Sequence, residues 1–356
     1  MKRLRVSELV PGMVTAEDVF NYNGQMVLPC GLTLTDKAIT RLEFYSILSV
    51  KVEDMVREDG FSYESTTLSE RIQASAEFKA FTKDYDDGLK NFKDSINRLV
   101  TENEPIPVDE MLDNALHILS QASTKYNTLD MLHNMRQYDD LTYAHSMNVA
   151  LICNVFSKWL KWSPEDQRLL TMCGLLHDIG KVKIPDAIIK KPDRLTEEEY
   201  KIVKTHAVEG YHILKAQNLD SHVVNAALMH HEKCDGSGYP LGLSAERIDR
   251  FAKAVSVVDV YDAMTSARIY RGALCPFRVI ELFESEGFQK YDAEFILTFL
   301  ENIVNTYLHN EVRLSDGRIG HIVFSNKMNL SKPIVQCGDE MVNLSLEHDL
   351  HIDELL

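Results

Sequence analysis

Between residues 129 and 311 the apolar positions recur every three or four residues, which is the spacing of one face of a helix. Polar residues mark two of the helix starts. Ser163, followed by Pro164 and two acidic residues, favours a helix that begins at Pro164. Thr196 is followed by three glutamates and forms a capping box with Glu199. The pattern predicts consecutive helices over residues 129–311.

The first 56 residues follow a different pattern, in which apolar and polar positions alternate as in strands. Asn23-Gly24 lies between two such runs and predicts a hairpin turn. Residues 34 to about 45 have a helical pattern, and residues 47–52 (ILSVKV) have the pattern of a strand. We expect a small β-rich module with one helix over residues 1–56.

Residues 57–128 are expected to be a linker followed by connector helices. The first dozen are polar and rich in turn formers, and a charged helical pattern follows from Ser69. Pro105 and Pro107 break this pattern in two. The first interpretation of these helices is a solvated spacer, and the alternative is a connector or oligomerisation element that would support a homodimer.

Strand-like alternation returns after residue 311. Asp316-Gly317 predicts a hairpin turn, and the runs PIVQ and VNLSL predict two short strands. Residues 312–356 are therefore expected to form a β-rich C-terminal extension. The predicted fold class is mainly α, an all-helical bundle between a small β-rich N-terminal module and a β-rich tail.

The charge balance excludes some partners. The chain has 356 residues, with 38 Lys and Arg against 54 Asp and Glu, so its formal net charge is −16. Such a chain is not expected to bind duplex nucleic acid or an anionic membrane. Its six cysteines form no CxxC pair, its first residues do not read as a signal peptide, and no apolar run is long enough to cross a bilayer. These features predict a soluble, cytoplasmic protein.

Histidines and aspartates recur among the apolar positions of the helical region. A single histidine on a helix is more often a satisfied or surface residue than a ligand, so no one of them is decisive. As a set they would be costly to bury, and a metal ion removes that cost. The candidates are His145, His177, Asp178, His206, His230, His231 and Asp259.

Nitrogen and oxygen ligands without thiolate suit Fe, Mn, Zn, Co or Ni. Seven ligands are too many for one tetrahedral ion, but they suit two ions bridged by a carboxylate. Two ions about 3.5–4 Å apart are a recurrent device for displacement at phosphoesters.

Two segments of the chain closely resemble the two signatures of the HD-GYP domain, a branch of the HD phosphohydrolase superfamily. They are LLHDIGKVKIPDAIIKKPDRLTEEE (175–199) and HHEKCDGSGYPLGL (230–243), with supporting pattern in YAHSMNVA and VDVYDAMTSARIYR. The resemblance extends from about Tyr138 to Arg271.

The resemblance implies a metal-dependent phosphodiesterase that hydrolyses cyclic di-GMP to pGpG through a metal-bridging hydroxide, and it leaves further cleavage to GMP open. By motif, one metal would be held by His145, His177, Asp178 and Asp259. Asp178 would bridge to a second metal held by His206, His230 and His231. Fe or Mn are the first candidates, with Zn, Co and Ni as alternatives. Asp178 and Lys181 would be the catalytic residues, with Lys181 lying against the scissile phosphate.

The resemblance also implies substrate contacts. Arg268 and Arg271 match basic positions near the ligand phosphates. The turn with Gly236, Gly238 and Tyr239 would border the substrate cleft. A role in shaping the loop, or in contacting a signalling partner, fits these three residues as well.

Several alternatives stay open. Leu141 stands where some members of the family have a glutamate for a third metal, which favours two metals. The substrate could be another cyclic dinucleotide such as cGAMP, or a nucleotide monoester. A receptor or scaffold that binds cyclic di-GMP without cutting it is the third reading. Glu232 could orient an imidazole or simply be a charge at a helix end, and Tyr143, Tyr239 and Tyr261 could stack on guanine or, for Tyr143 and Tyr261, lie in the core.

Overall fold

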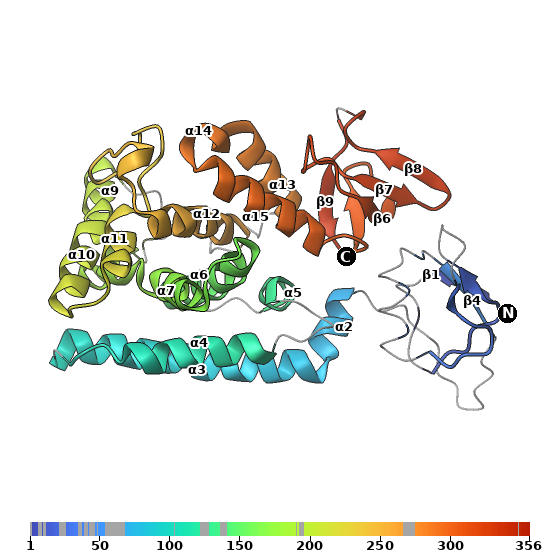
Figure 1. Cartoon of the computed structure of the whole chain (residues 1–356), viewed down its shortest axis with the longest axis horizontal. Coiled ribbons are helices and arrows are strands. Elements are labelled where there is room, and N and C mark those ends of the chain that lie inside the picture. The colour runs from blue at the N-terminus through green and yellow to red at the C-terminus, as the bar shows by residue number, and fades with distance from the viewer. Residues whose placement is uncertain are drawn as a thin grey trace. The chain divides into compact units, whose positions relative to one another are not determined.

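The structure is a computed structural model, and it divides into two compact units, residues 75–306 and the two terminal segments 1–74 and 307–356 (Figure 1). It describes residues 2–5, 9, 12–20, 26–34, 38, 42, 47, 49–53, 68–102, 104–121, 128–135, 141–189, 191, 196–265, 275–347 and 349–356. The predicted fold class, mainly helical with β-rich ends, is confirmed. Within the described residues, no helix is both long and apolar enough to cross a membrane.

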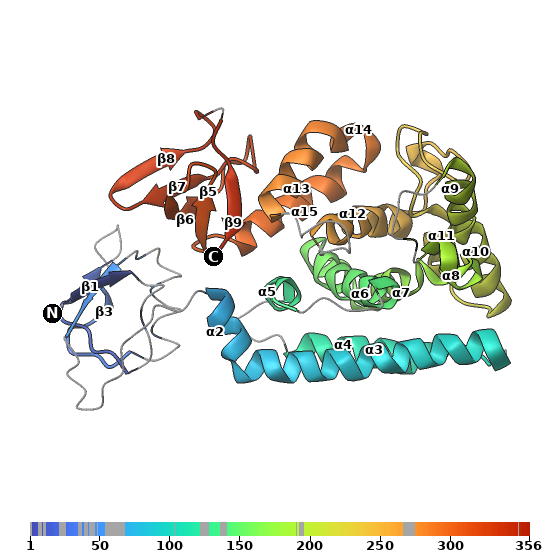
Figure 2. The ribbon, with the colours of Figure 1, turned by 180° about the vertical axis from the view of Figure 1, so that it is seen from behind.

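The unit formed by residues 75–306 consists of helices (Figures 1 and 2). They are α3 (Ala76–Glu102), α4 (Val108–Gln121), α5 (Thr128–His133), α6 (Leu141–Trp159), α7 (Pro164–Leu176), η2 (Ile179–Lys183), α8 (Asp186–Ile189), α9 (Glu197–Lys204), α10 (His206–Ala216), α11 (Ser221–Met229), η3 (Ala245–Arg247), α12 (Arg250–Thr265), α13 (Pro276–Leu282), η4 (Phe283–Gly287), α14 (Phe288–Lys290) and α15 (Ala293–Thr306).

Both helix starts predicted from the sequence are confirmed. The hydroxyl of Ser163 accepts a hydrogen bond from the amide of Asp166 at 3.1 Å, at the start of α7. At the start of α9, Thr196 and Glu199 form the reciprocal capping box. Each bond satisfies an amide that the first turn of a helix leaves without a partner.

Helices α6 and α7 pack closely at the centre of this unit. A Cβ atom on Gly174 of α7 would lie 2.9 Å from the Cα atom of Ala150 on α6, so only glycine allows this approach. The close pairing holds the C-terminal end of α7, where His177 and Asp178 follow, against the N-terminal half of α6, where His145 lies.

Helix α3 is not a solvated spacer, and that interpretation was wrong. Its apolar positions are buried, and the hydroxyl of Tyr85 hydrogen-bonds Asn148 at 2.6 Å and the carbonyl of Ala144 at 3.1 Å, both on α6. The stripe of apolar residues on α3 is therefore a packing face. The sequence pattern did not show this, because the partner helix lies some sixty positions along the chain. The predicted break at Pro105 and Pro107 is confirmed, between α3 and α4. The domain boundaries at 56, 128 and 311 stay predictions.

The N-terminal segment contains two antiparallel strand pairs, β1 (Lys2–Arg5) with β4 (Ser49–Val52) and β2 (Val19–Phe20) with β3 (Met26–Leu28). The predicted turn at Asn23-Gly24 lies outside the described residues. Of the predicted helix over residues 34–45, Ala38 and Leu42 are described as helical. Helix α2 (Leu68–Ala74) ends the segment.

The C-terminal segment forms a five-stranded antiparallel sheet in the order β8-β7-β6-β5-β9. Its strands are β5 (Glu311–Leu314), β6 (Ile319–Phe324), β7 (Ile334–Cys337), β8 (Glu340–Asn343) and β9 (Ile352–Leu355). The predicted hairpin is confirmed, with Gly317 at a φ of 89° in the turn between β5 and β6. Alternate residues of β5 are buried, as strand periodicity requires.

Candidate metal centre

Three buried histidines present the same ring atom, Nε2, to the carboxylate of Asp178, because each ring is tied to the backbone through its other nitrogen. The Nδ1 atom of His177 donates to the carbonyl of Gly174 at 2.7 Å, and that of His206 to Val203 at 2.7 Å. His230 donates from Nδ1 to the carbonyls of Ala226 and Ala227, each at 3.0 Å. These bonds fix the tautomer of each neutral ring, in which the Nε2 atom carries the lone pair.

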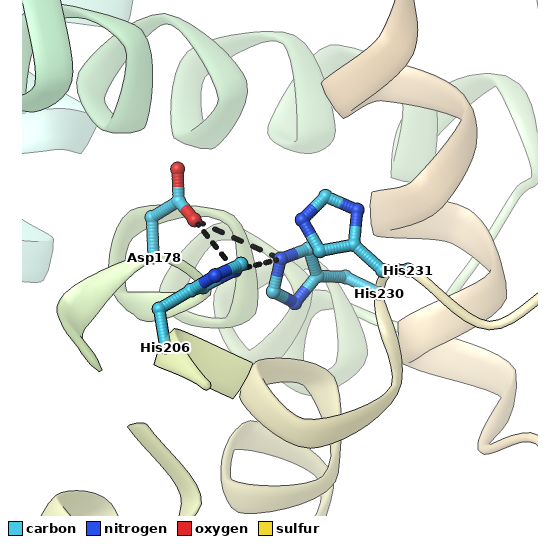
Figure 3. A group of neighbouring side chains, drawn as sticks. All are labelled: Asp178, His206, His230 and His231. Atoms are coloured by element: carbon cyan, nitrogen blue, oxygen red, sulfur yellow. Dashed lines mark hydrogen bonds and ion pairs between the residues drawn. The ribbon is translucent and has the colours of Figure 1, made fainter. Parts of the chain in front are cut away.

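The carboxylate of Asp178 faces the rings of His206 and His230 (Figure 3). Its Oδ1 atom is 3.3 Å from Nε2 of His206 and 3.7 Å from Nε2 of His230, and its Oδ2 atom is 3.3 Å from Nε2 of His177. The ammonium of Lys181 donates to Oδ2 from the next turn. Oδ1 of Asp178 thus lies near His206 and His230, and Oδ2 lies near His177.

Glycine makes this arrangement possible. A Cβ atom on Gly180, two residues after Asp178, would lie 1.9 Å from the carbonyl oxygen of His206 and 2.5 Å from the amide of Gly210. The short helix η2 therefore lies directly against α10. This contact brings Asp178 to His206, and it accounts for the glycine in the segment HDIGK.

His145 approaches the same centre from α6 and is held between two carboxylates of α12. Its Nδ1 atom is 2.7 Å from Oδ2 of Asp262, and its Nε2 atom is 2.9 Å from Oδ1 of Asp259. Oδ1 of Asp259 is also 3.9 Å from Nε2 of His177. Because Asp259 and Asp262 lie one helical turn apart, both carboxylates face the same ring.

The side chains form two groups whose ligand atoms all lie within 4.8 Å of one another, and Asp178 belongs to both. One group contains His145 and His177, and the other contains the three histidines drawn with Asp178 in Figure 3. Asp259 adjoins the first group through its contact with His145. The seven predicted ligands thus lie together, on α6, the α7–η2 junction, α10, the end of α11, and α12.

The donor set fits metal ions. Within the described residues, Nε2 of His177 and Oδ1 of Asp178 are buried and have no hydrogen-bond partner, which is costly for polar atoms. The Nε2 atoms of His206 and His230 lie 3.3 Å apart. Two imidazole nitrogens that bind one ion tetrahedrally, each at about 2.1 Å, are separated by about 3.4 Å. Nitrogen and carboxylate donors without thiolate favour Fe, Mn, Zn, Co or Ni.

The charges in the cluster are distributed unevenly. Burial opposes a charge on His145, but hydrogen bonds to Asp259 and Asp262 outweigh it and raise the pKa of the ring to about 10. Burial lowers the pKa of His231 to about 3 and holds that of His230 well below its usual range. Burial opposes ionisation of Asp178, yet the neighbouring Lys181 and His177 hold its pKa well below the usual range. The rings of His230 and His231 are therefore neutral beside an ionised Asp178, as metal binding requires, whereas His145 must first lose a proton.

The glycine-rich loop after α11 is fastened to the ligand-bearing backbone. Glu232 is buried, and its two carboxylate oxygens accept hydrogen bonds from the amides of Leu241 at 2.6 Å and Leu243 at 2.8 Å. A Cβ atom on Gly238 would lie 2.4 Å from the Cα atom of Glu232. Neither interpretation of Glu232 made from the sequence was right, because this side chain anchors the loop.

The remaining candidate residues differ in their distance from the cluster. Tyr239 lies beside the cluster, with its ring stacked on that of His231 at 4.7 Å between centroids. Gly236 has a φ of 78° and serves the turn. Arg268 and Arg271 lie outside the described residues. Tyr143 and Tyr261 pack edge-on against Phe92 and Phe299.

Sequence reasoning missed the orienting role of Asp262. The only signal for it in the sequence is its position one helical turn after Asp259, in the segment VDVYDAM. Its partner His145 is 117 residues away, and no local pattern reports that contact.

Known proteins are similar to this chain over the helical region that carries these side chains. Residues 110–295 match a family model described as an HD domain. A cyclic di-GMP phosphodiesterase of Pseudomonas aeruginosa is 34% identical over 212 residues, which cover 59% of this chain and 51% of that protein. The 3′3′-cGAMP-specific phosphodiesterase 1 of Vibrio cholerae is 38% identical over 145 residues, 41% of this chain and 34% of that protein.

The cyclic di-GMP phosphodiesterase response regulator RpfG of Xanthomonas campestris is 40% identical over 149 residues, 41% of this chain and 39% of that protein. The chain therefore spans about a third to a half of the length of these relatives. Among solved structures, an HDG"Y"P protein from Bdellovibrio bacteriovorus is 17% identical, with a TM-score of 0.48, over 85% of this chain and 99% of that chain.

Proposed function

Because the chain belongs to the HD domain family, we propose that it is a metal-dependent phosphodiesterase that hydrolyses cyclic di-GMP to pGpG, with further cleavage to GMP left open. The observation that carries this proposal is the convergence of tautomer-locked histidines on Asp178, which leaves buried Nε2 and carboxylate atoms without partners. The similarity to cyclic di-GMP phosphodiesterases supports the choice of substrate.

Two divalent ions are the proposed cofactors, Fe or Mn first, with Zn, Co or Ni as alternatives. His145, His177, Asp178 and Asp259 would hold one ion, and Asp178, His206, His230 and His231 the other. Such ions activate water as a nucleophile and stabilise charge on the phosphate.

The protein's own residues have separate tasks in this proposal. Asp178 holds the two groups of ligands together. Lys181, whose ammonium is fixed on Asp178, would offset the charge that develops on the scissile phosphate. Asp262 keeps the ring of His145 in one orientation. Gly236, Gly238, Tyr239, Arg268 and Arg271 are proposed to contact the substrate.

A second candidate function uses the same centre on 3′3′-cGAMP, and the similarity to the V. cholerae enzymes specific for that dinucleotide favours it. A receptor without activity would not need all seven ligand positions, and this chain retains them. A cytoplasmic location, a homodimer through the helical region and a signalling partner at the glycine-rich loop stay predictions.

The test is elemental analysis of protein purified anaerobically, coupled to turnover of cyclic di-GMP, 3′3′-cGAMP and a nucleotide monoester. We expect about two ions per chain and fastest turnover of cyclic di-GMP. The double variant H177A/D178A should lose both metal and activity. The proposal fails if that variant hydrolyses cyclic di-GMP as fast as the wild type.

A further inference from the structure

Helix α9 brings a second tyrosine and a lysine next to the metal centre. The ammonium of Lys204 lies 5.6 Å from the ring centroid of Tyr239, which itself stacks on His231. The same ammonium lies 5.1 Å from the ring centroid of Tyr200, one turn earlier on α9. Three successive contacts thus connect Tyr200 to a proposed metal ligand. We call Tyr200, Lys204 and Tyr239 the tyrosine–lysine ladder.

The outer end of the ladder is open to solvent. Tyr200 is 49% exposed, whereas Tyr239 is partly buried between His231 and Lys204. A large aromatic ring exposed beside a catalytic centre is available to a ligand, and every nucleobase offers a flat π-face of similar size.

The charge of Lys204 is available as well. Within the described part of the chain it forms no ion pair with a carboxylate, whereas Lys191 is bound to Glu199 of the same helix at 2.6 Å. A lysine near aromatic rings and without a counterion attracts phosphate oxygens. The ladder therefore combines a stacking surface with a positive charge.

A second tyrosine–lysine pair on α10 provides a comparison. Tyr211 and Lys215 have the same spacing and a similar ring contact, 5.0 Å, but the ammonium of Lys215 also donates to the hydroxyl of its own tyrosine at 2.8 Å. The described residues contain no contact from that pair to Tyr239 or to a proposed ligand. A tyrosine and a lysine four residues apart therefore do not by themselves form a chain of contacts that reaches the metal centre.

We propose that the tyrosine–lysine ladder is a nucleobase subsite, in which one purine of the cyclic dinucleotide stacks on Tyr200 while Lys204 faces its phosphate. This inference rests on the proposed function, because the substrate must have a base for Tyr200 to receive. It assigns to α9 a part in substrate affinity that is separate from the hydrolytic chemistry.

The test compares Y200A with the matched control Y211A in the full-length, metal-loaded protein. KM and kcat are measured for cyclic di-GMP and for bis(4-nitrophenyl) phosphate, a phosphodiester without a nucleobase. Binding of cyclic di-GMP to the metal-free protein is measured by calorimetry. We expect Y200A to raise KM and Kd for cyclic di-GMP about tenfold, within the roughly 5- to 150-fold range for loss of one base–aromatic stack.

The pattern across substrates and variants decides the outcome. Turnover of bis(4-nitrophenyl) phosphate and the metal content should be unchanged in Y200A, Y211A should match the wild type, and Y200F, which keeps the ring, should restore KM. KM and Kd for cyclic di-GMP within twofold of the wild type in Y200A would overturn the subsite and leave the proposed function standing. A wild-type protein that cleaves bis(4-nitrophenyl) phosphate but no cyclic dinucleotide would overturn both.

Discussion

Replacing Asp262 by asparagine tests whether the metal centre depends on a residue that binds no metal itself. Asp262 is buried, and its carboxylate is 2.7 Å from Nδ1 of His145. Asparagine keeps the shape and one acceptor oxygen but removes the negative charge. The ring of His145 then becomes a weaker and less firmly oriented ligand.

The magnitude follows from two opposing effects. Loss of a partner behind a ligating histidine typically lowers metal affinity by about 10- to 100-fold, or about 1.4–2.7 kcal/mol. The pKa of His145 is raised to about 10 in the metal-free protein, so binding at neutral pH must also displace a proton. D262N reduces this second cost, because one of the two carboxylates that raise the pKa is gone. The full loss of affinity should therefore emerge only toward alkaline pH.

The assay is anaerobic titration with Mn²⁺ at pH 7, 8 and 9, in calorimetry buffers of different ionisation enthalpy, which counts the protons released. The wild type should release about one proton from His145 and bind more tightly as the pH rises. D262N should release fewer protons and show a flatter pH dependence.

D249N is the matched control. Asp249 makes the same kind of contact, 2.8 Å to Nδ1 of His222, and it belongs to neither group of candidate ligands. It also caps the start of α12, so D249N can lower thermal stability without changing Mn²⁺ binding. Equal proton release and equal affinity in D262N and the wild type would refute the orienting role of Asp262.

Three further predictions concern the surroundings of the centre. E232Q should lower the free energy of unfolding by about 1–3 kcal/mol in denaturant titration, because an amide replaces a buried carboxylate that accepts hydrogen bonds from two loop amides; an unchanged midpoint would contradict the anchor. G180A should cost about 3 kcal/mol or more, since its Cβ would lie 1.9 Å from the carbonyl oxygen of His206, and a stable variant with normal metal content would rule out this packing. In metal-free protein, the stabilisation due to the raised pKa of His145 should be complete below about pH 6.5 and lost as the pH rises to about 10, so unfolding free energies that do not fall between pH 6.5 and 10 would contradict it.

The sequence predicted those parts of the fold that local chemistry determines. The caps at Ser163 and Thr196 and the breaks at Pro105 and Pro107 depend on residues within a few positions of each other, and the structure has them where the pattern placed them. The face of α3 could be recognised as apolar, but the sequence did not show that α6 covers it. Packing between distant helices has no local signature.

The candidate site divides in the same way. The ligand positions could be taken from the resemblance. Four of them lie in the two signatures, His145 and Asp259 lie in the supporting segments, and His206 lies between the signatures. The contact between Asp262 and His145 joins two helices, and it appears only when α6 and α12 pack. The role of Glu232 could not be predicted because the sequence does not show that this side chain is buried. From sequence a charged residue at a helix end reads as exposed, yet it is 2% exposed and holds two amides.

The candidate metal-binding histidines and the glycine-rich loop, residues 230–239, are therefore linked by direct contacts. Glu232 follows the two histidines directly, and its carboxylate holds the far end of the loop, while Gly238 packs on its backbone and Tyr239 on the ring of His231. Any movement of the loop must shift the backbone that carries His231. If Tyr239 contacts substrate, substrate affinity and metal affinity are then coupled through these contacts. E232Q should weaken both together, whereas Y200A, which leaves the anchor intact, should weaken only the first.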